Sequence, residues 1–511
     1  MRVLVTGGTG VVGQAAVDAL VARGHEVRLC SRNAGEDARD WPDGVEAHPG
    51  NVADAASIAG AAEGCDAVLH CAGIVDETPP EVTFQRVNVD GTRHVLEEAR
   101  RAGVDRVIYV SSLGADSGES PYHASKRAAE ALVRDWSGTW TILRPGNVYG
   151  PGDEVISLLM KMVRTLPVVP VVDQGDQPFE PIWAGDLGEA IAQAVERDDL
   201  AGRVLELAGA ERTSMNDLIE RLSRLTNRAP TRLPIPGFLA SLGARVADLV
   251  GISTPINESQ LTMLREENVI ERPGGNALTS VFGVTPTPLD EGLKRLADTL
   301  PEQLPADGVG SLKRKRFWAE IEGCRMTPEA LFEKVRHEFA VLTPGTVDVG
   351  VEAGTPDVPD EGETLTLSLP LRGHVQVRVA EVTPRAMTLV TVEGHPLAGA
   401  VRFLSEQRGD RVRFEVQVYD RAGNFVDWVT MSTVGGMLQN RTWEETVENV
   451  VHASGGTAPE GVQSETVTLD ADELERINAW LDDLVTALKR EGRAEAAPRR
   501  ETPLEQESPR P

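Results

Sequence analysis

Short apolar runs alternate with amphipathic stretches through the first 150 residues of the chain. Continuous apolar runs predict buried strands at Arg2–Thr6, Val27–Cys30, Ala67–His70, Val107–Ser111 and Trp140–Arg144. Apolar residues at helical spacing predict helices over Val11–Arg23, Thr92–Ala102 and Ala124–Asp135. Parallel neighbouring strands need crossover connections, so this alternation predicts an α/β fold with a doubly wound parallel sheet.

The pattern loosens after Gly150, where prolines interrupt short apolar pieces. Helical spacing returns at Asp186–Arg197 and Ser214–Leu225. We interpret residues 151–300 as mainly a smaller, substrate-covering lobe of a nucleotide-binding domain that spans residues 1–305. The proline- and glycine-rich stretch Pro301–Gly310 is the expected linker.

Residues 312–454 have a different pattern, which predicts a separate α+β domain. A helix is expected at Pro328–Phe339 and a longer one, interrupted by two glycines, at Trp428–Val451. Alternating apolar and polar residues predict strands at Leu365–Leu371, His374–Glu381, Met387–Val392, Val401–Ser405 and Arg411–Val418.

Two further segments follow this domain. Residues 465–490 are expected to contain an amphipathic helix, since Ala471–Lys489 carries one apolar stripe. The stripe would dock on the domain or on a partner. Residues 491–511 mix charge and proline and are expected to be disordered.

The charge of the chain excludes several classes of function. Its net charge is −28, which opposes binding to nucleic acid or to anionic membrane surfaces.

No apolar stretch is long enough for a transmembrane segment, and the chain opens directly into a strand rather than a signal peptide. Its four cysteines form no CxxC pair, so no metal site is expected. A cytoplasmic location is therefore the expectation.

A glycine-rich turn joins the first strand to the first helix. Gly7, Gly10 and Gly13 have the spacing that allows, in turn, a tight turn, close approach of a pyrophosphate and close packing of helix on strand. The free N–H groups at the start of the helix, around Val11 and Val12, would face the anion. The spacing favours dinucleotide binding over a merely structural turn.

The residues after the second strand indicate which dinucleotide is bound. An NAD site usually carries an acidic residue there, but this chain reads Ser31-Arg32-Asn33, with no acid before Glu36. The guanidinium of Arg32 matches a 2′-phosphate. NADP(H) is therefore favoured over NAD(H), and the alternative is that Arg32 is an ordinary solvated loop charge.

Tyr122 and Lys126 lie one helical turn apart, on the same face of a predicted helix. A nearby cation favours the phenolate, so Lys126 is expected to lower the pKa of Tyr122 toward the range of an acid–base catalyst. Ser111 and Ser112 end the fourth predicted strand, at the edge of the sheet where such folds bind ligands.

Several motifs together resemble the extended or atypical short-chain dehydrogenases/reductases, which include nucleotide-sugar epimerases and dehydratases. They cover about the first 150 residues: TGGTGVVG at 6–13, HCAG at 70–73, VNVDGT at 87–92, YVSS at 109–112, YHASK at 122–126 and RPGNVYG at 144–150.

The resemblance implies a role for each matching residue. Tyr122 would be the acid–base residue, and Lys126 would hold the nicotinamide ribose. Ser112, with Ser111 as the alternative, would bind the reacting oxygen. Asn88 would order the catalytic helix. Further cofactor contacts are implied at Asn51, Val52, Cys71, Ala72, Gly73, Asn88, Pro145 and Val148, although the family more often has Asp at the place of Asn51.

Later segments resemble a narrower branch of this family. Val204–Ala208, Asn257–Asn268 and Phe282–Glu291 are similar to the nucleotide-binding accessory subunit of respiratory complex I and its bacterial relatives. In that branch some members bind NADPH mainly as a structural element. This membership leaves the reaction open.

The C-terminal domain resembles helix-grip, START-like ligand-binding domains of an uncharacterised family. The resemblance rests on VEGHPLAG at 392–399 and RFEV at 413–416. It implies an apolar cavity, lined by a helix over Met431–Val447, for a hydrophobic ligand. A dimerisation module is the alternative, which leaves a homodimer open. His395 is expected to be structural.

Three functions remain open from the sequence. The first is an NADP(H)-dependent oxidoreductase that reduces a carbonyl or oxidises a hydroxyl of a small organic substrate. The second is a nucleotide-sugar epimerase or dehydratase with tightly bound NAD(P). The third is a non-catalytic, NADPH-loaded binding or assembly protein with a hydrophobic-ligand domain.

Overall fold

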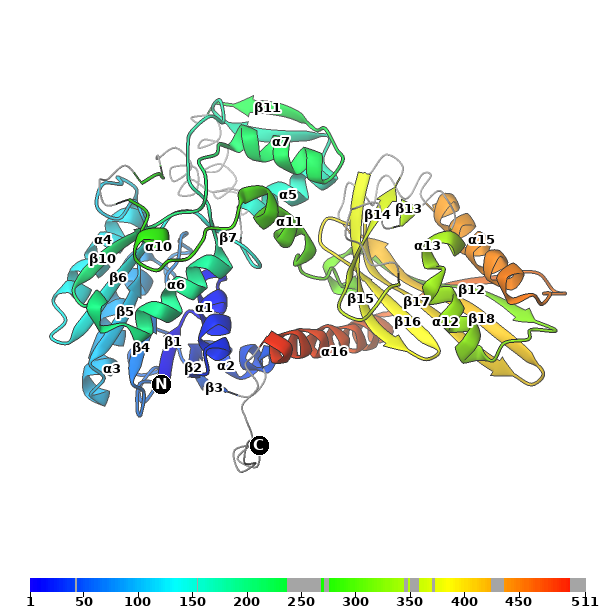
Figure 1. Cartoon of the computed structure of the whole chain (residues 1–511), viewed down its shortest axis with the longest axis horizontal. Helices are drawn as coiled ribbons and strands as arrows, with labels where there is room; N and C mark the ends of the chain where they lie inside the picture. Colours follow the sequence, from blue (N-terminus) through cyan, green and yellow to red (C-terminus); the bar gives the residue numbers. More distant parts are fainter. Residues whose placement is uncertain are drawn as a thin grey trace, which may run out of the picture.

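The computed structural model describes residues 1–41, 44–153, 155–236, 268–270, 275–343, 348–349, 358–369, 373–423 and 436–496. An N-terminal α/β part and a C-terminal part built on an antiparallel sheet lie beside each other (Figure 1). The long helix α16 (Ala471–Ala496) lies between them (Figure 1).

The N-terminal part is built on a parallel sheet, as the sequence predicts. Its described residues form seven strands in the order β10-β6-β5-β4-β1-β2-β3. These are β1 (Arg2–Thr6), β2 (Glu26–Ser31), β3 (Val45–Pro49), β4 (Ala67–His70), β5 (Arg106–Val110), β6 (Thr139–Pro145) and β10 (Arg203–Leu207). The doubly wound α/β fold is confirmed. The edge strands β3 and β10 were not among the predicted strands.

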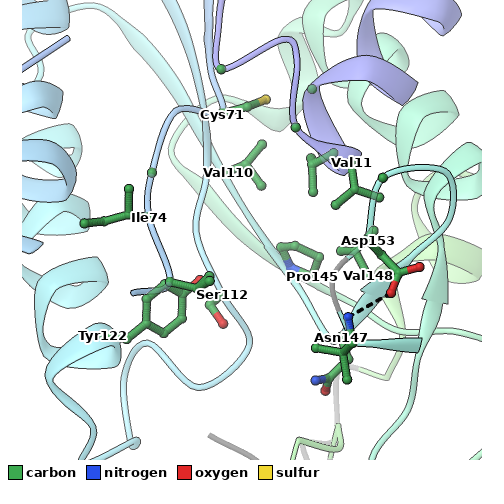
Figure 2. Close-up of a pocket in the computed structure, with 18 of the residues that line it drawn as sticks. Val11, Cys71, Ile74, Val110, Ser112, Tyr122, Pro145, Asn147, Val148 and Asp153 are labelled. Atoms are coloured by element: carbon green, nitrogen blue, oxygen red, sulfur yellow. Dashed lines mark hydrogen bonds between the residues drawn. The ribbon is translucent and has the colours of Figure 1, made fainter. Parts of the chain in front are cut away.

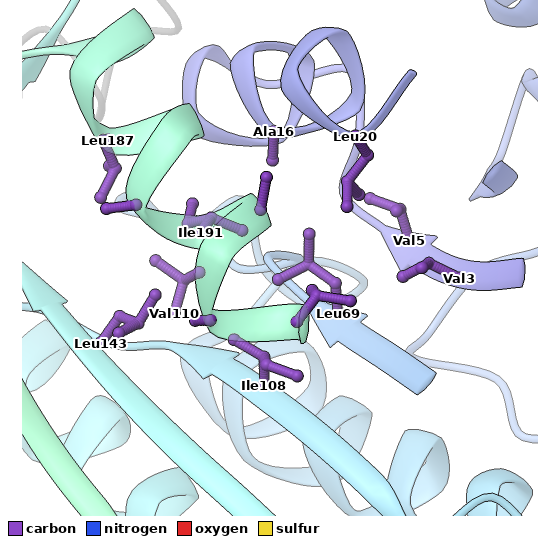
Figure 3. Close-up of a cluster of buried hydrophobic side chains, with 14 of the residues drawn as sticks. Val3, Val5, Ala16, Leu20, Leu69, Ile108, Val110, Leu143, Leu187 and Ile191 are labelled. Carbon is purple, nitrogen blue, oxygen red and sulfur yellow. The ribbon is translucent and has the colours of Figure 1, made fainter. Parts of the chain in front are cut away.

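Helices cover both faces of this sheet. On one face, α1 (Val11–Ala22) and α6 (Ala184–Glu196) pack on Val5, Leu69 and Ile108 (Figure 3). On the other, α3 (Gly91–Ala102) and α4 (Pro121–Arg134) cover Leu4, Val68 and Tyr109. Helix α6 lies within residues 151–300 but belongs to the core of the nucleotide-binding domain and not to the lobe.

The lobe has its own small core. It comprises α5 (Ile156–Thr165), β8 (Val168–Val172), α7 (Met215–Leu225), β11 (Thr231–Ile235) and α11 (Leu289–Asp298). Strands β8 and β11 pair in parallel, and Val169 and Val171 of β8 pack with apolar residues of the three helices. Of the predicted segment 257–268, only Asn268 lies within the described residues.

The C-terminal domain carries an antiparallel sheet whose described residues form eight strands, in the order β13-β14-β15-β16-β17-β18-β12-β19. They are β12 (Val309–Ile321), β13 (Asp348–Val349), β14 (Thr364–Leu369), β15 (Gly373–Thr383), β16 (Ala386–Thr391), β17 (Leu397–Arg408), β18 (Arg411–Ala422) and β19 (Gln463–Thr468). Strand β12 begins inside the expected linker, which is therefore shorter than predicted.

Helices lie on both faces of this sheet. The helices α12 (Pro328–His337), α13 (Phe339–Leu342) and α15 (Gly436–Ser454) share one apolar core with its inner face. The first eight residues of the predicted helix Trp428–Val451 lie outside the described residues. Residues of α16, including Trp480 and Leu481, pack on the opposite face.

The ends of α16 differ from the prediction. Residues 465–468 belong to strand β19, which pairs with β12, so the helix begins only at Ala471. At its other end the helix continues through Ala496, so residues 491–496 are helical and not disordered. Among the described residues, none of the helices has the length and apolar character needed to cross a bilayer.

Candidate active site

The glycine-rich turn has the geometry that its spacing predicts. Gly7 has a φ of +70°, and a Cβ there would lie 2.5 Å from the backbone nitrogen of Ala72. A Cβ at Gly13 would lie 2.0 Å from the carbonyl oxygen of Gly7, so helix and turn pack too closely for a side chain. At Gly10 the nearest protein atom to a Cβ is 3.8 Å away. The space above Gly10 is thus a cradle that a cofactor fits.

A cavity of about 740 Å³ begins at this turn and extends into the lobe. Figure 2 shows Val11 and Cys71 at one end, Tyr122 with Ser112 on one side, and Pro145 with Val148 opposite them. The predicted cofactor-contact residues that line it are Gly7, Gly10, Val11, Val12, Gly13, Ser31, Arg32, Asn51, Val52, Cys71, Ala72, Gly73, Lys126, Pro145 and Val148.

The end of β2 forms the far wall of the cavity. Arg32 lines it and is exposed, which leaves its guanidinium accessible to an anion. The hydroxyl of Ser31 donates a hydrogen bond to the carboxylate of Asp37 in α2 (Ala34–Asp37). An acidic side chain is therefore present beside this loop, although its oxygen is used by Ser31. Sequence reasoning missed Asp37 because it lies six positions after Ser31.

Tyr122 and Ser112 lie next to each other in the cavity wall (Figure 2). Burial raises the pKa of Tyr122 to about 12, although a hydrogen bond with the Ser112 side chain lowers it. The expectation that Lys126 lowers this pKa below its ordinary value is wrong for the structure as it stands, because the desolvation of the phenol outweighs the other effects. Tyr122 is therefore a protonated phenol at neutral pH.

Lys126 is almost fully buried beneath the cavity. Its ammonium donates a hydrogen bond of 3.0 Å to the carbonyl oxygen of Val110 and lies 5.1 Å from the centre of the Tyr109 ring. Burial lowers the pKa of Lys126 to about 8. A Cβ on Gly73 would lie 3.2 Å from the Lys126 nitrogen, so the glycine keeps the chain close to this ammonium.

Asn88 does not line the cavity, in contrast to its predicted cofactor contact. It is 1% exposed and lies in η2 (Gln85–Asp90), a π-helical segment. Its Oδ1 accepts from the N–H of Ile74 at 2.8 Å, and its Nδ2 donates to the carbonyl of Ile74 and to Ser125. Asn88 therefore ties a cavity-lining loop to the helix that carries Tyr122, which fits the predicted ordering role.

A buried ion pair fixes the same helix to the sheet. Arg144, at the end of β6, makes two 2.8 Å hydrogen bonds to the carboxylate of Glu130 in α4. Both side chains are buried, and Arg144 also lies 3.0 Å from Asp116. The pair positions α4 relative to Pro145, which borders the cavity. Its Glu130 partner was not found from the sequence, because only the fold brings the two residues together.

The lobe supplies the other end of the cavity, which is mainly apolar. Its lining side chains are Val155, just before α5, and Ile156, Leu158, Leu159 and Met162 of α5, joined by Pro170, Val172, Pro178, Phe179 and Met215. Asp153 also lines it, but its carboxylate accepts hydrogen bonds from Ile156 and Ser157 at the start of α5. Among the described lining residues, Arg32 and Lys126 are the only cations, and neither lies in the lobe.

The position of the lobe residues in the fold could be predicted only in part. Helix α5 was not among the predicted helices, and its apolar residues alone do not reveal which side faces a ligand. Within the part of the chain that the structure describes, no three His, Cys, Asp or Glu side chains gather as a metal site.

A glycine-rich turn, a parallel sheet and a Tyr–Lys–Ser group at the same cavity define an NAD(P)-dependent oxidoreductase or epimerase. Family comparison agrees: the model of the NAD dependent epimerase/dehydratase family matches residues 3–208. Ceramide reductase of Caulobacter vibrioides is 38% identical over 252 residues, which cover 47% of this chain and 75% of that protein. The chain therefore belongs to the NAD dependent epimerase/dehydratase family.

Two other relatives match at lower identity. The 2-alkyl-3-oxoalkanoate reductase of Stenotrophomonas maltophilia is 34% identical over 176 residues, 30% of this chain and 53% of that protein. The mitochondrial NADH dehydrogenase (ubiquinone) 1 alpha subcomplex subunit 9 of Rattus norvegicus is 27% identical over 270 residues, 50% and 70% of the two chains. The predicted resemblance to the complex I subunit is thus confirmed. Among solved structures, MoeE5 in complex with UDP-glucose and NAD covers 58% of this chain and 97% of its own at 24% identity, with a TM-score of 0.45.

Proposed function

We propose that the protein is an NADP(H)-dependent oxidoreductase that interconverts a carbonyl and a secondary hydroxyl on a substrate with an extended apolar portion. One observation carries the proposal. A single cavity runs from the glycine-rich turn, past Tyr122 and Ser112, into the apolar wall of the lobe. A cofactor at the turn and an apolar substrate in the lobe would therefore meet beside the phenol.

The side chains of this chain would handle the proton of the reaction. Ser112 would donate a hydrogen bond to the carbonyl oxygen, and Tyr122 would deliver its proton to that oxygen during reduction. Tyr122 holds its proton at neutral pH and is therefore in the form that can donate it, although burial makes it a weaker acid than a free tyrosine. The ammonium of Lys126 would hold the ribose hydroxyls. The bound nicotinamide supplies the hydride.

The preference for NADP(H) rests on Arg32. Its exposed guanidinium lies at the end of the cavity that would receive the adenosine, where it matches a 2′-phosphate. The carboxylate of Asp37 accepts a hydrogen bond from Ser31 next to this loop, so the proposal requires that Arg32 outweighs that carboxylate.

Two relatives support an apolar substrate. Their names describe reductases of a ceramide and of a 2-alkyl-3-oxoalkanoate, both of which carry apolar alkyl groups. The lining of the lobe is of the same chemical character. A nucleotide sugar would bring a diphosphate to the lobe, where the described lining offers no cation to receive it. Epimerisation or dehydration of a nucleotide sugar is therefore the less favoured function.

The experiment is steady-state oxidation of NADPH with a panel of carbonyl compounds that includes long-chain 3-oxo esters. Turnover is expected with the wild-type protein and lost in Tyr122→Phe, which keeps the ring but removes the proton donor. Tyr419→Phe is the matched control, because that hydroxyl bonds Gln417 in the C-terminal sheet. Equal activity of the wild-type protein and Tyr122→Phe would refute the proposal, as would cofactor that stays bound and is never consumed.

The cytoplasmic location, a homodimer and a hydrophobic ligand of the C-terminal domain stay predictions. Mass spectrometry of small molecules that co-purify with the intact chain tests the last of these. A polar residue in place of Met162 is expected to weaken apolar binding in the lobe. An apolar molecule that still co-purifies with this variant would therefore lie outside the lobe.

A further inference from the structure

The loop between β16 and β17, residues 392–396, joins the C-terminal domain to the lobe. It contains the VEGH sequence whose role the proposed reaction does not explain. Val392, at its start, is 0% exposed and packs in the lobe core with Ile156, Leu159 and Val163. A side chain of the second domain therefore completes the core of the first.

Polar contacts surround this apolar one. The ammonium of Lys161 in α5 lies 2.5 Å from the carboxylate of Glu393. Arg164, one turn further along and 4% exposed, donates to the side-chain carbonyl of Gln376 at 2.8 Å and to the main-chain oxygen of Glu393 at 3.3 Å. A Cβ at Gly394 would lie 2.9 Å from Cδ of Arg164, so the loop approaches α5 closely.

Gln376 extends this contact to a second helix of the lobe. It is 2% exposed, and its Nε2 donates to the carboxylate of Asp298 at the end of α11. Arg378, two positions later in β15, donates to the main-chain oxygens of Asp298 and Leu300. Strand β15 therefore holds both α5 and α11.

Helix α5 is the shared element between this interface and the cavity. Its residues Leu158, Leu159 and Met162 line the cavity, whereas Lys161 and Arg164 contact the C-terminal domain. A rigid helix cannot move at one face without moving the other. The contacts of the second domain therefore determine where the apolar wall stands relative to Tyr122.

We propose that the C-terminal domain is a positioning element for the substrate site, with Lys161 and Arg164 of α5 and Gln376 and Glu393 of the second domain as positioning residues. The inference rests on the proposed function for its kinetic consequence, but not for its structural one. It gives the fusion of the two domains a purpose: the second domain sets which apolar substrates the first one accepts.

A charge exchange tests the proposal in the full-length chain. Lys161→Glu and Glu393→Lys each place like charges together, and the double variant restores an opposite pair in reversed order. Each single variant is expected to raise KM for a long-chain 3-oxo ester by about threefold to tenfold and to leave KM for NADPH unchanged. In the double variant, KM for the ester should return most of the way to its wild-type value. Arg408→Glu is the control, since Arg408 pairs with Glu406 on an exposed part of the C-terminal sheet.

Hydrogen exchange gives a second readout that needs no turnover. Arg164→Ala removes the buried contact with Gln376 and should speed amide exchange over residues 156–165, with no such change over residues 122–134. If both the KM values and the exchange over 156–165 equal those of the wild-type protein in all variants, the proposal is wrong. If no carbonyl is turned over but exchange over 156–165 rises, the proposed function fails and the positioning contact stands.

Discussion

Nδ2 of Asn88 donates a 2.9 Å hydrogen bond to Oγ of Ser125, and Ser125 donates in turn to the carbonyl oxygen of Tyr122 at 2.7 Å. The relay joins a π-helical segment to the first turn of α4, where Tyr122 stands. The other two hydrogen bonds of the Asn88 amide hold the backbone of Ile74, which lines the cavity. One buried side chain thus sets the distance between the loop and the phenol.

Asn88→Ala is expected to lower kcat by about 10- to 100-fold, because the phenol loses its fixed position relative to the substrate oxygen. The part-buried N–H and C=O of Ile74 lose their partner as well, at a cost of about 1–3 kcal/mol in the free energy of unfolding. Steady-state kinetics and urea unfolding measure the two effects. Ser125→Ala, which removes only the relay, should lower kcat with a smaller loss of stability. Full kcat in Asn88→Ala would contradict the positioning role.

The reduction is expected to slow as the pH rises through about 8. Burial lowers the pKa of Lys126 to about 8, so the folded protein loses this charge well before a free lysine would. Tyr122, with a pKa of about 12, still holds its proton there. The pH profile of kcat/KM for NADPH reports the free enzyme and should show this fall. A profile that stays flat between pH 7 and 10 would show that the charge of Lys126 is not needed.

Although activity is expected to fall as Lys126 loses its proton, the stability of the fold is expected to rise over the same pH range. Between pH 8 and 10.5, the two pKa values of Lys126, the unfolded chain holds a proton that the folded protein has released. The unfolded state therefore binds more protons in this window, and the contribution of Lys126 to stability rises with pH. In Lys126→Met, the melting temperature should therefore rise less between pH 8 and 10.5 than it does in the wild-type protein. An identical pH dependence of wild type and variant would refute the lowered pKa.

The sequence was sufficient for the parts of the fold that rest on local patterns. The strands at Arg2–Thr6 and Ala67–His70 lie where continuous apolar runs predict them, since both faces of a parallel strand are covered by helices. Within the glycine-rich turn, Gly13 follows from local sterics, because it packs against Gly7, whereas the contact of Gly7 with Ala72 depends on the fold. Every predicted cofactor-contact residue except Asn88 lines one cavity because strand ends of a parallel sheet share one edge.

Features that depend on distant contacts could not be predicted. Strand β12 carries four consecutive basic residues, Lys313–Arg316, and its partners β18 and β19 lie about 100 or more residues later in the chain. Helix α6 has an ordinary amphipathic pattern, and this pattern does not reveal that the helix packs on α1. The pKa of Tyr122 depends on burial by the whole fold, and the neighbouring Lys126 alone suggested the wrong direction.

Arg32→Asp should change the cofactor preference. The substitution removes a charge-assisted hydrogen bond to a 2′-phosphate and adds a repulsive carboxylate, so the Kd for NADPH is expected to rise by about 10- to 100-fold. The Kd for NADH should change by less than about threefold, because that cofactor has a hydroxyl at the same position. Fluorescence titration with both cofactors measures the two constants, and NADH serves as the internal control. Equal losses for the two cofactors would refute the preference for NADP(H).

Gly10 and Gly13 offer a pair of matched substitutions that separate cofactor binding from folding. Gly10→Ala places a methyl group in the cavity, with its nearest protein atom 3.8 Å away, and Gly10 has an ordinary φ of −79°. The variant should unfold within about 1 kcal/mol of the wild-type protein. Its affinity for NADPH should fall by about tenfold or more, because the methyl group occupies the cradle of the pyrophosphate.

Gly13→Ala should behave in the opposite way. Its methyl group would lie 2.0 Å from the carbonyl oxygen of Gly7, so α1 must move away from the turn, at a cost of about 3 kcal/mol in the free energy of unfolding. Urea unfolding without cofactor, followed by NADPH titration, distinguishes the two variants. If Gly10→Ala binds NADPH as tightly as the wild-type protein does, the cofactor must lie elsewhere. The added methyl group would otherwise occupy the proposed position of the pyrophosphate.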